Sequence, residues 1–262
     1  MSLRIAAFQF STKPAIEENL RSLERGIIRA SENGVHLLLT QECALTGYPP
    51  VEIPTTSFIK RSELEDALDR LRGLAVERAL NLVVGTACWL DSRWRNSLVV
   101  LDPGKGRAFR YDKRALWGWD RDNFTEGTAA GILDIQGVKV GLGICFEIRF
   151  PEYFREMFDA AVEVALVSFC DVALKANPAR RSIIRSHLVT RAVENAFHVV
   201  SANTVAIGQT APTMVVSPDG SVLCEASDRE EDLIYFDYQR GEPNFGRRGR
   251  IDVSRALRST MR

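Results

Sequence analysis

Cys145 is the residue of this 262-residue sequence that is best placed to act as a nucleophile. It ends the apolar run Val138 to Ile144, shortly before a predicted helix begins at Pro151. In open α/β sheets, reactive groups gather beyond the carboxyl ends of the strands. A thiol on such a turn can face a cleft while the amide of Phe146 points at an oxyanion. Taken alone, a cysteine that ends a buried strand is more often a small core residue, and the motifs described below are what favour nucleophilic catalysis.

A cysteine nucleophile needs a neighbour that lowers its thiol pKa from about 8.5 or takes its proton. The sequence contains three histidines, which are His36, His187 and His198. None of them follows the end of a predicted strand. Glu42 does, after the run Val35 to Leu39, and so does Lys113, after Arg107 to Tyr111. A carboxylate base with an ammonium partner is the economical arrangement that remains.

Alternating strand and helix patterns must position these three side chains. Leu3 to Phe10 is rich in strand formers, and Ile16 to Ala30 carries apolar residues at helical spacing. Val35 to Leu39 is a short apolar run of the kind that is buried on both faces of a sheet. The chain therefore begins as strand, helix and strand, which is typical of an α/β domain.

The same analysis predicts the remaining elements. Helices are expected over Ser57 to Ala79, Pro151 to Ala161, and from the Asn177-Pro178 cap to Ala196. Strands are expected over Leu82 to Leu90, Ser97 to Leu101, Arg107 to Tyr111, Val138 to Ile144, Val162 to Phe169, Phe197 to Ala202 and, as a late antiparallel group, Thr213 to Val216, Ser221 to Glu225 and Leu233 to Tyr238. We expect residues 1–262 to form one domain, because no linker or repeat interrupts the pattern.

The composition excludes several classes of protein. Hydrophobic residues make up 45% of the chain and charged residues 26%, as in globular proteins, so a disordered or fibrous chain is excluded. Lys plus Arg and Asp plus Glu each number 34, so the net charge is zero and a general attraction to nucleic acid or anionic lipid is absent. No apolar run reaches the roughly 18 residues that a membrane helix needs.

Cysteine usage and the first residues bear on compartment and cofactors. The five cysteines are widely spaced and contain no CxxC pair, so they predict neither a disulfide framework nor a metal site. The segment Met1 to Phe10 has the pattern of a strand rather than of a secretion signal. We therefore expect a cytoplasmic protein that uses no metal and no cofactor.

Four ordered motifs resemble the nitrilase superfamily of carbon-nitrogen hydrolases. They are Leu37 to Glu42 with Leu45 to Pro50, Arg95 to Val100, Tyr111 to Leu116, and Gly143 to Glu152. Later segments similar to the superfamily's late helix, strand and hairpin are Arg191 to Asn195, Ser201 to Asn203 and Ser217 to Gly220. The resemblance covers most of the chain. It implies a four-layer α-β-β-α sandwich, a Glu-Lys-Cys catalytic set and a homodimer formed through the helical face.

Carried onto this sequence, the resemblance implies hydrolysis of a non-peptide C–N bond in a small amide or N-carbamoyl compound. Cys145 would attack the carbonyl carbon to form a thioester, and Glu42 would move the protons and activate water. Lys113 and the Phe146 amide would stabilise the oxyanion, where loss of one donor typically costs about 2.7 to 4 kcal/mol. Lys113 is therefore expected to matter more to the rate than to folding.

Some residues depart from the superfamily pattern. Gln41 replaces a common proline before Glu42, and Asp120 stands where many members have a second glutamate. An aspartate is one methylene shorter, which leaves open whether Asp120 reaches the site. Phe146 follows the nucleophile where nitrilases more often have tryptophan, and this favours an amide over a nitrile substrate.

Other residues near the motifs are expected to have supporting roles. Glu147 and Arg149 are predicted to form an ion pair beside the site rather than to contact substrate directly. Cys170 ends a neighbouring strand and is predicted to line the pocket or core without reacting. Residues 240–262 hold seven arginines and form a tail, for which solvent exposure or contact with a second subunit is favoured over phosphate binding.

Three other functions stay open at this point. Gln41 and Asp120 are compatible with a scaffold or interaction protein that kept the fold and lost activity. Nitrile hydrolysis is the second alternative. The segment Leu45 to Pro50 also resembles glutaminase domains, so an ammonia-donating subunit of a synthetase is the third, although the chain has no ATP-binding motif.

Overall fold

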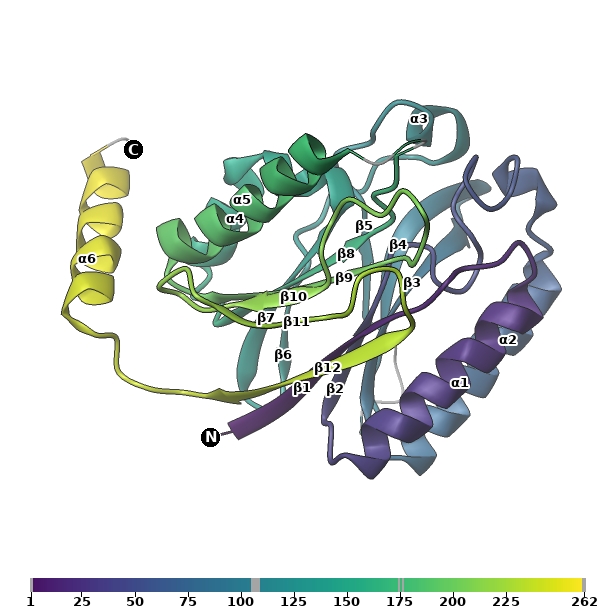
Figure 1. Ribbon diagram of the computed structural model, residues 1–262, viewed down its shortest axis with the longest axis horizontal. Coiled ribbons are helices and arrows are strands. Elements are labelled where there is room, and N and C mark those ends of the chain that lie inside the picture. The colour runs from purple at the N-terminus through teal and green to yellow at the C-terminus, as the bar shows by residue number, and fades with distance from the viewer. Residues whose placement is uncertain (1, 105–108, 174, 176, 261–262) are drawn as a thin grey trace.

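The computed structural model describes residues 2–104, 109–173, 175 and 177–260 of the chain. Two six-stranded sheets stack face to face, and helices cover both outer faces (Figure 1). This is the four-layer α-β-β-α sandwich that the sequence motifs predicted. Strand ends from the two sheets meet at one edge of the sandwich, and they carry the residues described below.

Each sheet mixes parallel and antiparallel strands. The first sheet has the order β12-β1-β2-β3-β4-β5. Its strands are β1 (Ser2–Gln9), β2 (Leu37–Thr40), β3 (Asn81–Leu90), β4 (Arg93–Leu101), β5 (Phe109–Asp112) and β12 (Asp232–Gln239). The second sheet has the order β11-β10-β9-β8-β7-β6. Its strands are β6 (Ile132–Ile135), β7 (Val138–Ile144), β8 (Val164–Phe169), β9 (His198–Asn203), β10 (Met214–Val216) and β11 (Val222–Glu225).

The long helices form the outer layers. Helices α1 (Ile16–Glu32) and α2 (Arg61–Glu77) cover the first sheet, and α4 (Pro151–Asp159) and α5 (Pro178–Asn195) cover the second (Figure 1). The short helical turns are η1 (Thr56–Phe58), α3 (Asp120–Asn123) and η2 (Cys145–Arg149). The last helix, α6 (Phe245–Thr260), lies beyond the sandwich on the side of α4 and α5 (Figure 1).

Apolar side chains fill the three spaces between the four layers. Leu20 of α1 is buried in the outer cluster of the first sheet, and Leu188 of α5 is buried in the outer cluster of the second. Leu39 and Leu142 are buried in the cluster between the two sheets. Full burial of such a side chain contributes about 1.5 to 3 kcal/mol. The strands of both sheets are thus held rigidly where they end at the site.

Most predicted elements are confirmed, with shifted ends. The helix predicted over residues 57–79 is divided into the turn η1 and the helix α2, which begins only at Arg61. The Thr55 side chain caps η1 by accepting a hydrogen bond from the Ser57 amide. Helix α5 begins as expected at Pro178, after the Asn177 side chain, which accepts a bond of 3.0 Å from the Arg180 amide. Of the strand predicted over Arg107 to Tyr111, residues 109–111 lie in β5 (Phe109–Asp112), and residues 107 and 108 lie outside the described residues.

Two predictions about the end of the chain need correction. β12 does not stay with β10 and β11 but pairs antiparallel with β1 in the other sheet, with Phe236 opposite Ile5. An apolar strand pattern defines a buried face without defining the neighbouring strand. The tail forms α6, which was not expected because Gly246 and Gly249 lower helix propensity. Among the described residues, no helix is both long and apolar enough to cross a membrane.

Candidate active site

Glu42, Lys113 and Cys145 each follow the carboxyl end of a strand, as predicted. Glu42 lies just beyond β2, Lys113 directly after β5 and Cys145 directly after β7. The Lys113 Nζ donates to Glu42 Oε1 at 2.7 Å, and neither side chain is exposed to solvent. The first sheet therefore supplies a buried carboxylate and a buried ammonium, and the second sheet supplies the thiol.

Hydrogen bonds between the sheets fix this meeting point. The Ser168 hydroxyl donates to the Thr40 carbonyl at 2.7 Å, and the Glu42 amide donates to the Phe169 carbonyl at 3.2 Å. Within the first sheet, Gly85 of β3 lets the residue before Glu42 pass close to this strand, because a Cβ at position 85 would lie 2.0 Å from the Gln41 carbonyl oxygen. The backbone on both sides of Glu42 is thereby held in one place.

Two further donors orient the Glu42 carboxylate. Asn96 Nδ2 donates to Glu42 Oε1 at 2.7 Å, and the Cys170 amide donates to Oε2 at 2.8 Å. Sequence reasoning did not single out Asn96. Asn96 lies within the Arg95 to Val100 motif, and its burial in the structure requires a partner, since buried polar groups are normally hydrogen-bonded.

The Gln41 side chain, which departs from the superfamily pattern, leaves the position of the carboxylate intact. Its Nε2 donates to the Phe10 carbonyl at 2.9 Å and to Thr12 Oγ1 at 3.1 Å. Gln41 thus ties the segment before Glu42 to the end of β1. The substitution serves packing and hydrogen bonding at the base of the site.

Asp120 reaches the site despite its shorter side chain. Its Oδ2 accepts from Lys113 Nζ at 2.8 Å and from the Trp117 amide at 2.9 Å, while its Oδ1 accepts from the Tyr48 hydroxyl at 2.7 Å. The short turn α3 brings the backbone close enough to compensate for the missing methylene. Asp120 is therefore a second carboxylate partner of Lys113.

Lys113 is a permanent cation between these two carboxylates. Burial acts to lower the pKa of its ammonium, and the charges of Glu42 and Asp120 more than offset this and raise the pKa well above its usual value. Replacing Lys113 with a neutral residue would leave two buried carboxylates without their shared partner, which is strongly destabilising. Lys113 is therefore expected to stabilise the folded site in addition to its predicted effect on the rate.

Cys145 sits half-buried at the wall of a pocket. Its φ is 46°, a left-handed conformation that presents the side chain at the sharp turn between β7 and η2. Burial and then the Glu42 charge raise the pKa of the Cys145 thiol well above its usual value, while Lys113 opposes the shift. The thiol is therefore protonated at rest, and it needs a base to react as a nucleophile.

The predicted ion pair between Glu147 and Arg149 does not form among the described residues. The Glu147 carboxylate instead points inward, where Oε1 accepts from the Tyr111 hydroxyl at 2.8 Å and the Arg114 amide at 2.6 Å. Its Oε2 accepts from the Ile144 amide at 2.7 Å. Arg149 lies outward with its guanidinium over the Phe146 ring. Two positions apart on a helical turn, the two side chains face different directions.

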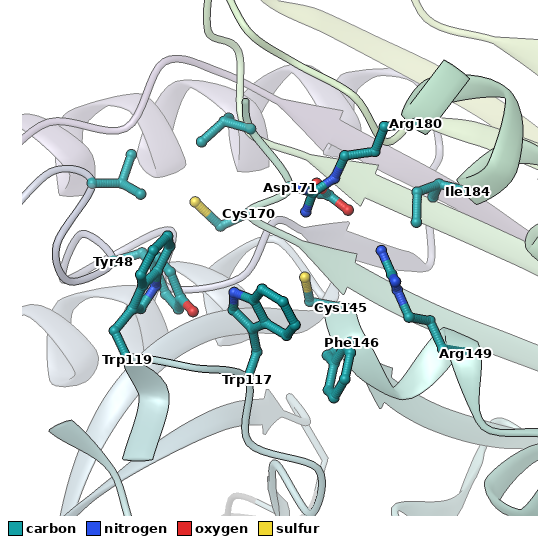
Figure 2. Close-up of a pocket in the computed structure, with 12 residues that line it drawn as sticks. Tyr48, Trp117, Trp119, Cys145, Phe146, Arg149, Cys170, Asp171, Arg180 and Ile184 are labelled. Atoms are coloured by element: carbon teal, nitrogen blue, oxygen red, sulfur yellow. The ribbon is translucent and has the colours of Figure 1, made fainter. Parts of the chain in front are cut away.

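The pocket is small, and aromatic side chains form part of its wall. Its cavity volume is about 90 Å³, and its aromatic lining consists of Tyr48, Trp117, Trp119 and Phe146. Cys145 and Cys170 also face it, so Cys170 lines the pocket as expected (Figure 2). A volume of this size admits a few water molecules or one small organic molecule. Among the described residues, no cluster of His, Cys, Asp or Glu has the arrangement of a metal site.

Comparison with known proteins agrees with this geometry. The family model for carbon-nitrogen hydrolase matches residues 4–243. An (R)-stereoselective amidase from Pseudomonas sp is 30% identical over 67% of this chain and 66% of its own length. A glutamine-dependent NAD(+) synthetase from Xanthomonas campestris is 26% identical over 94% of this chain and 45% of its own length. The chain therefore spans less than two thirds of the first of these relatives and less than half of the second.

A solved structure has a similar fold across most of the chain. A variant of the amidase from Nesterenkonia sp. AN1, with the acetamide moiety of fluoroacetamide added covalently at its active-site cysteine, superposes with a TM-score of 0.80 at 26% identity. The match covers 90% of both chains. Given the family match over residues 4–243 and this likeness, the chain belongs to the carbon-nitrogen hydrolase family of the nitrilase superfamily, whose members cleave C–N bonds other than peptide bonds.

Proposed function

We propose that the protein hydrolyses a small non-peptide amide or N-carbamoyl compound through a thioester on Cys145. The observation that carries the proposal is the buried Glu42-Lys113-Asp120 cluster beside a half-buried thiol at an open pocket. The cysteine adduct of the Nesterenkonia amidase supports the same chemistry. The activity requires no metal and no cofactor.

In the first half of the reaction, the Cys145 sulfur attacks the carbonyl carbon of the amide. Because the thiol is protonated at rest, Glu42 takes its proton as the S–C bond forms. The oxyanion is stabilised by Lys113 Nζ and the Phe146 amide. The C–N bond then breaks, Glu42 returns the proton to the departing nitrogen, and ammonia or an amine leaves.

In the second half, water replaces the amine. Glu42 takes a proton from the water as its oxygen attacks the thioester carbon. The C–S bond then breaks, and Glu42 gives that proton to the departing sulfur, which releases the carboxylic acid and regenerates the Cys145 thiol. Asn96 and the Cys170 amide keep the Glu42 carboxylate in one orientation through both steps. Asp120 acts as a positioning residue through Lys113.

The decisive measurement is ammonia release from a panel of small amides, combined with intact-protein mass spectrometry. Cys145→Ala is expected to abolish ammonia release and the acyl adduct, while Cys224→Ala, another half-buried thiol on β11, retains both. Release of ammonia by Cys145→Ala at the wild-type rate would refute the proposal. Absence of turnover and of any Cys145 adduct would instead favour the scaffold alternative.

A second variant separates the two proposed steps of Glu42. p-Nitrophenyl esters have a leaving group that departs without a proton. Glu42→Gln also removes a charge that raises the pKa of the Cys145 thiol and keeps Lys113, which lowers it, so this variant should acylate on these esters and then stall. We expect a burst of nitrophenol equal to one acyl group per protein, followed by little turnover. Multiple rapid turnovers by Glu42→Gln would contradict the role of Glu42 in activating water.

An ammonia-donating role remains the second candidate, because the synthetase relative aligns with 94% of this chain. It requires a separate synthetase partner, and it fails if co-purification yields no complex. We also propose a cytoplasmic location and a homodimer joined through the helical face.

A further inference from the structure

Glu147 is a fully buried carboxylate that lies two residues after the nucleophile and outside the lining of the pocket. Its Oε2 accepts a hydrogen bond from the Ile144 amide at 2.7 Å. Its Oε1 accepts from the Tyr111 hydroxyl at 2.8 Å and from the Arg114 and Ala115 amides at 2.6 Å and 3.3 Å. These donors occupy the acceptor positions of both oxygens, so the carboxylate is held in one orientation.

The donors to Glu147 belong to segments of both sheets. Ile144 ends β7 in the second sheet, directly before Cys145. Arg114 directly follows Lys113, which comes just after β5 in the first sheet. Glu147 therefore joins the turn that carries the thiol to the segment that carries the ammonium.

The hydrogen bond from the Ile144 amide also closes the turn around Phe146. Cys145 and Phe146 lie between Ile144 and Glu147 in the sequence, so this bond restricts the peptide units of both. The φ of 46° at Cys145 is unfavourable and persists only where the surrounding structure holds it. The direction of the Phe146 N–H therefore depends on the Glu147 side chain.

We propose that Glu147 is a positioning residue that sets the spacing between the two oxyanion donors, the Phe146 amide and Lys113 Nζ. The inference rests on the proposed function, in which these two groups receive the negative oxygen of the tetrahedral intermediate. Each sheet supplies one of the donors, and Glu147 bonds to the backbone beside both. Donors that are already in place stabilise an oxyanion well, because they need not move as its charge develops.

The charge of the Glu147 carboxylate matters to this link. Burial raises the pKa of the carboxyl group, and the hydrogen bonds from the Arg114 and Ile144 amides and the Tyr111 hydroxyl oppose that shift, as does the Lys113 charge. All of these hydrogen bonds use the carboxylate as an acceptor. In Glu147→Gln, one oxygen becomes an N–H donor that faces another donor, so the substitution changes the volume little and breaks part of the link.

The test compares two reactions of Cys145, of which only one forms an oxyanion. Hydrolysis of a small amide passes through an oxyanion, whereas alkylation of the thiol by iodoacetamide displaces iodide and forms none. Glu147→Gln should lower kcat for amide hydrolysis by about 100-fold with little change in KM, as misplacement of a catalytic group predicts. The rate of alkylation, measured by mass spectrometry as the carbamidomethyl adduct on Cys145, should stay close to that of wild type.

Glu156 provides a matched control, because its carboxylate also pairs with Arg114. This contact is made to the guanidinium at 2.6 Å, and the Glu156 side chain is 43% exposed, so Glu156→Gln should keep the wild-type kcat. Glu147→Asp retains the charge and should recover part of the kcat that Glu147→Gln loses. Tyr111→Phe removes one donor and leaves the carboxylate in place. It should lower kcat by less than Glu147→Gln, and it decides the question should the glutamine variant fail to fold.

The outcomes separate this inference from the proposed function. If hydrolysis and alkylation fall equally in Glu147→Gln, the residue maintains the thiol rather than the oxyanion donors, and the inference is overturned. Unchanged hydrolysis in Glu147→Gln, or in Tyr111→Phe where the first variant does not fold, also overturns it, and the amidohydrolase stands. If the wild-type protein hydrolyses no amide and Cys145 takes up no acyl group, the proposed function itself has failed, and this inference fails with it.

Discussion

Cys145 occupies a backbone conformation that ordinary side chains avoid. Its φ of 46° lies in the left-handed region, which costs a residue other than glycine on the order of 1 to 3 kcal/mol. The inward-facing Glu147 carboxylate helps to hold the turn by accepting from the Ile144 amide at 2.7 Å. Glycine would relieve the strain but has no sulfur. The protein therefore loses stability at this residue to present a thiol at the pocket.

This strain predicts an inverted stability order for two substitutions of Cys145. In most positions alanine is more stable than glycine, but glycine adopts positive φ without a steric cost. Cys145→Gly should therefore be more stable than Cys145→Ala by about 1 kcal/mol. Urea unfolding of the two variants gives the comparison, and both lack the thiol, so ligand effects cancel. An alanine variant that equals or exceeds the glycine variant would rule out strain at this turn.

At the scale of elements, the loop between β2 and η1 forms one wall of the site. Tyr48 lies in this loop, lines the pocket and donates to Asp120. The Glu52 carboxylate caps the loop by accepting from the Tyr48 amide at 2.8 Å. Burial raises the pKa of Glu52 to about 7. The hydrogen bond from the Tyr48 amide acts to lower this pKa, and the Glu42 charge acts to raise it. The loop therefore becomes charged within the physiological pH range.

The raised pKa of Glu52 predicts a pH dependence of stability. The folded protein holds the Glu52 carboxyl proton more tightly than the unfolded chain does. The contribution of this carboxyl group to folding stability is therefore fully present below pH 4.5 and is lost as pH rises from 4.5 to about 7. Glu52→Gln removes the titration, and Gln can still accept from the Tyr48 amide. Relative to wild type, the variant should gain at most about 1.4 kcal/mol of stability for each pH unit in this window.

Urea unfolding at several pH values between 4 and 8 measures this effect. Glu65→Gln, on the exposed surface of α2, serves as the control for loss of one carboxylate. Parallel stability curves for wild type and Glu52→Gln across this range would show that the loop does not titrate as described. A gain in the stability of Glu52→Gln over wild type that occurs only below pH 4.5 would contradict the raised pKa of Glu52.

At the scale of the whole molecule, local pattern predicted the elements and the motifs predicted how they meet. Apolar periodicity defined α1, and the Asn177 cap defined the start of α5. Periodicity alone could not bring Glu42 and Lys113 within 2.7 Å of each other, since that contact depends on the strand order β2-β3-β4-β5 within the first sheet. The resemblance to a known superfamily supplied this long-range information.

The errors arose where tertiary packing overrides sequence spacing. Glu147 and Arg149 have opposite charges and are close in sequence, yet the turn of η2 directs one inward and the other to the pocket. The sequence left open whether the short Asp120 side chain reaches the site, and the packing around α3 places it 2.8 Å from Lys113 Nζ. The partner of β12 depends on which sheet edge is free after the rest has folded, and local sequence does not encode this.

The helix α6 argues for association of two copies of the whole chain. Phe245 and Val253 lie eight residues apart on one side of the helix and are 97% and 60% exposed. Ion pairs join α6 to its own sandwich, between Arg250 and Asp219 and between Arg258 and Asp159. An exposed apolar stripe of this kind is typical of an interface. We expect the stripe to pack against a second copy at the helical face.

Sedimentation equilibrium at micromolar concentration tests this expectation. The wild-type protein should have twice the mass of one chain, and the double substitution Phe245→Asp with Val253→Asp should shift it to the mass of a single chain. Because the pocket is built from residues of one chain, the separated variant should keep its fold by circular dichroism. Asp252→Ala, on the polar side of α6, is the matched control and should stay paired. A wild-type protein of single-chain mass, or a double variant that still pairs, would exclude α6 as the contact.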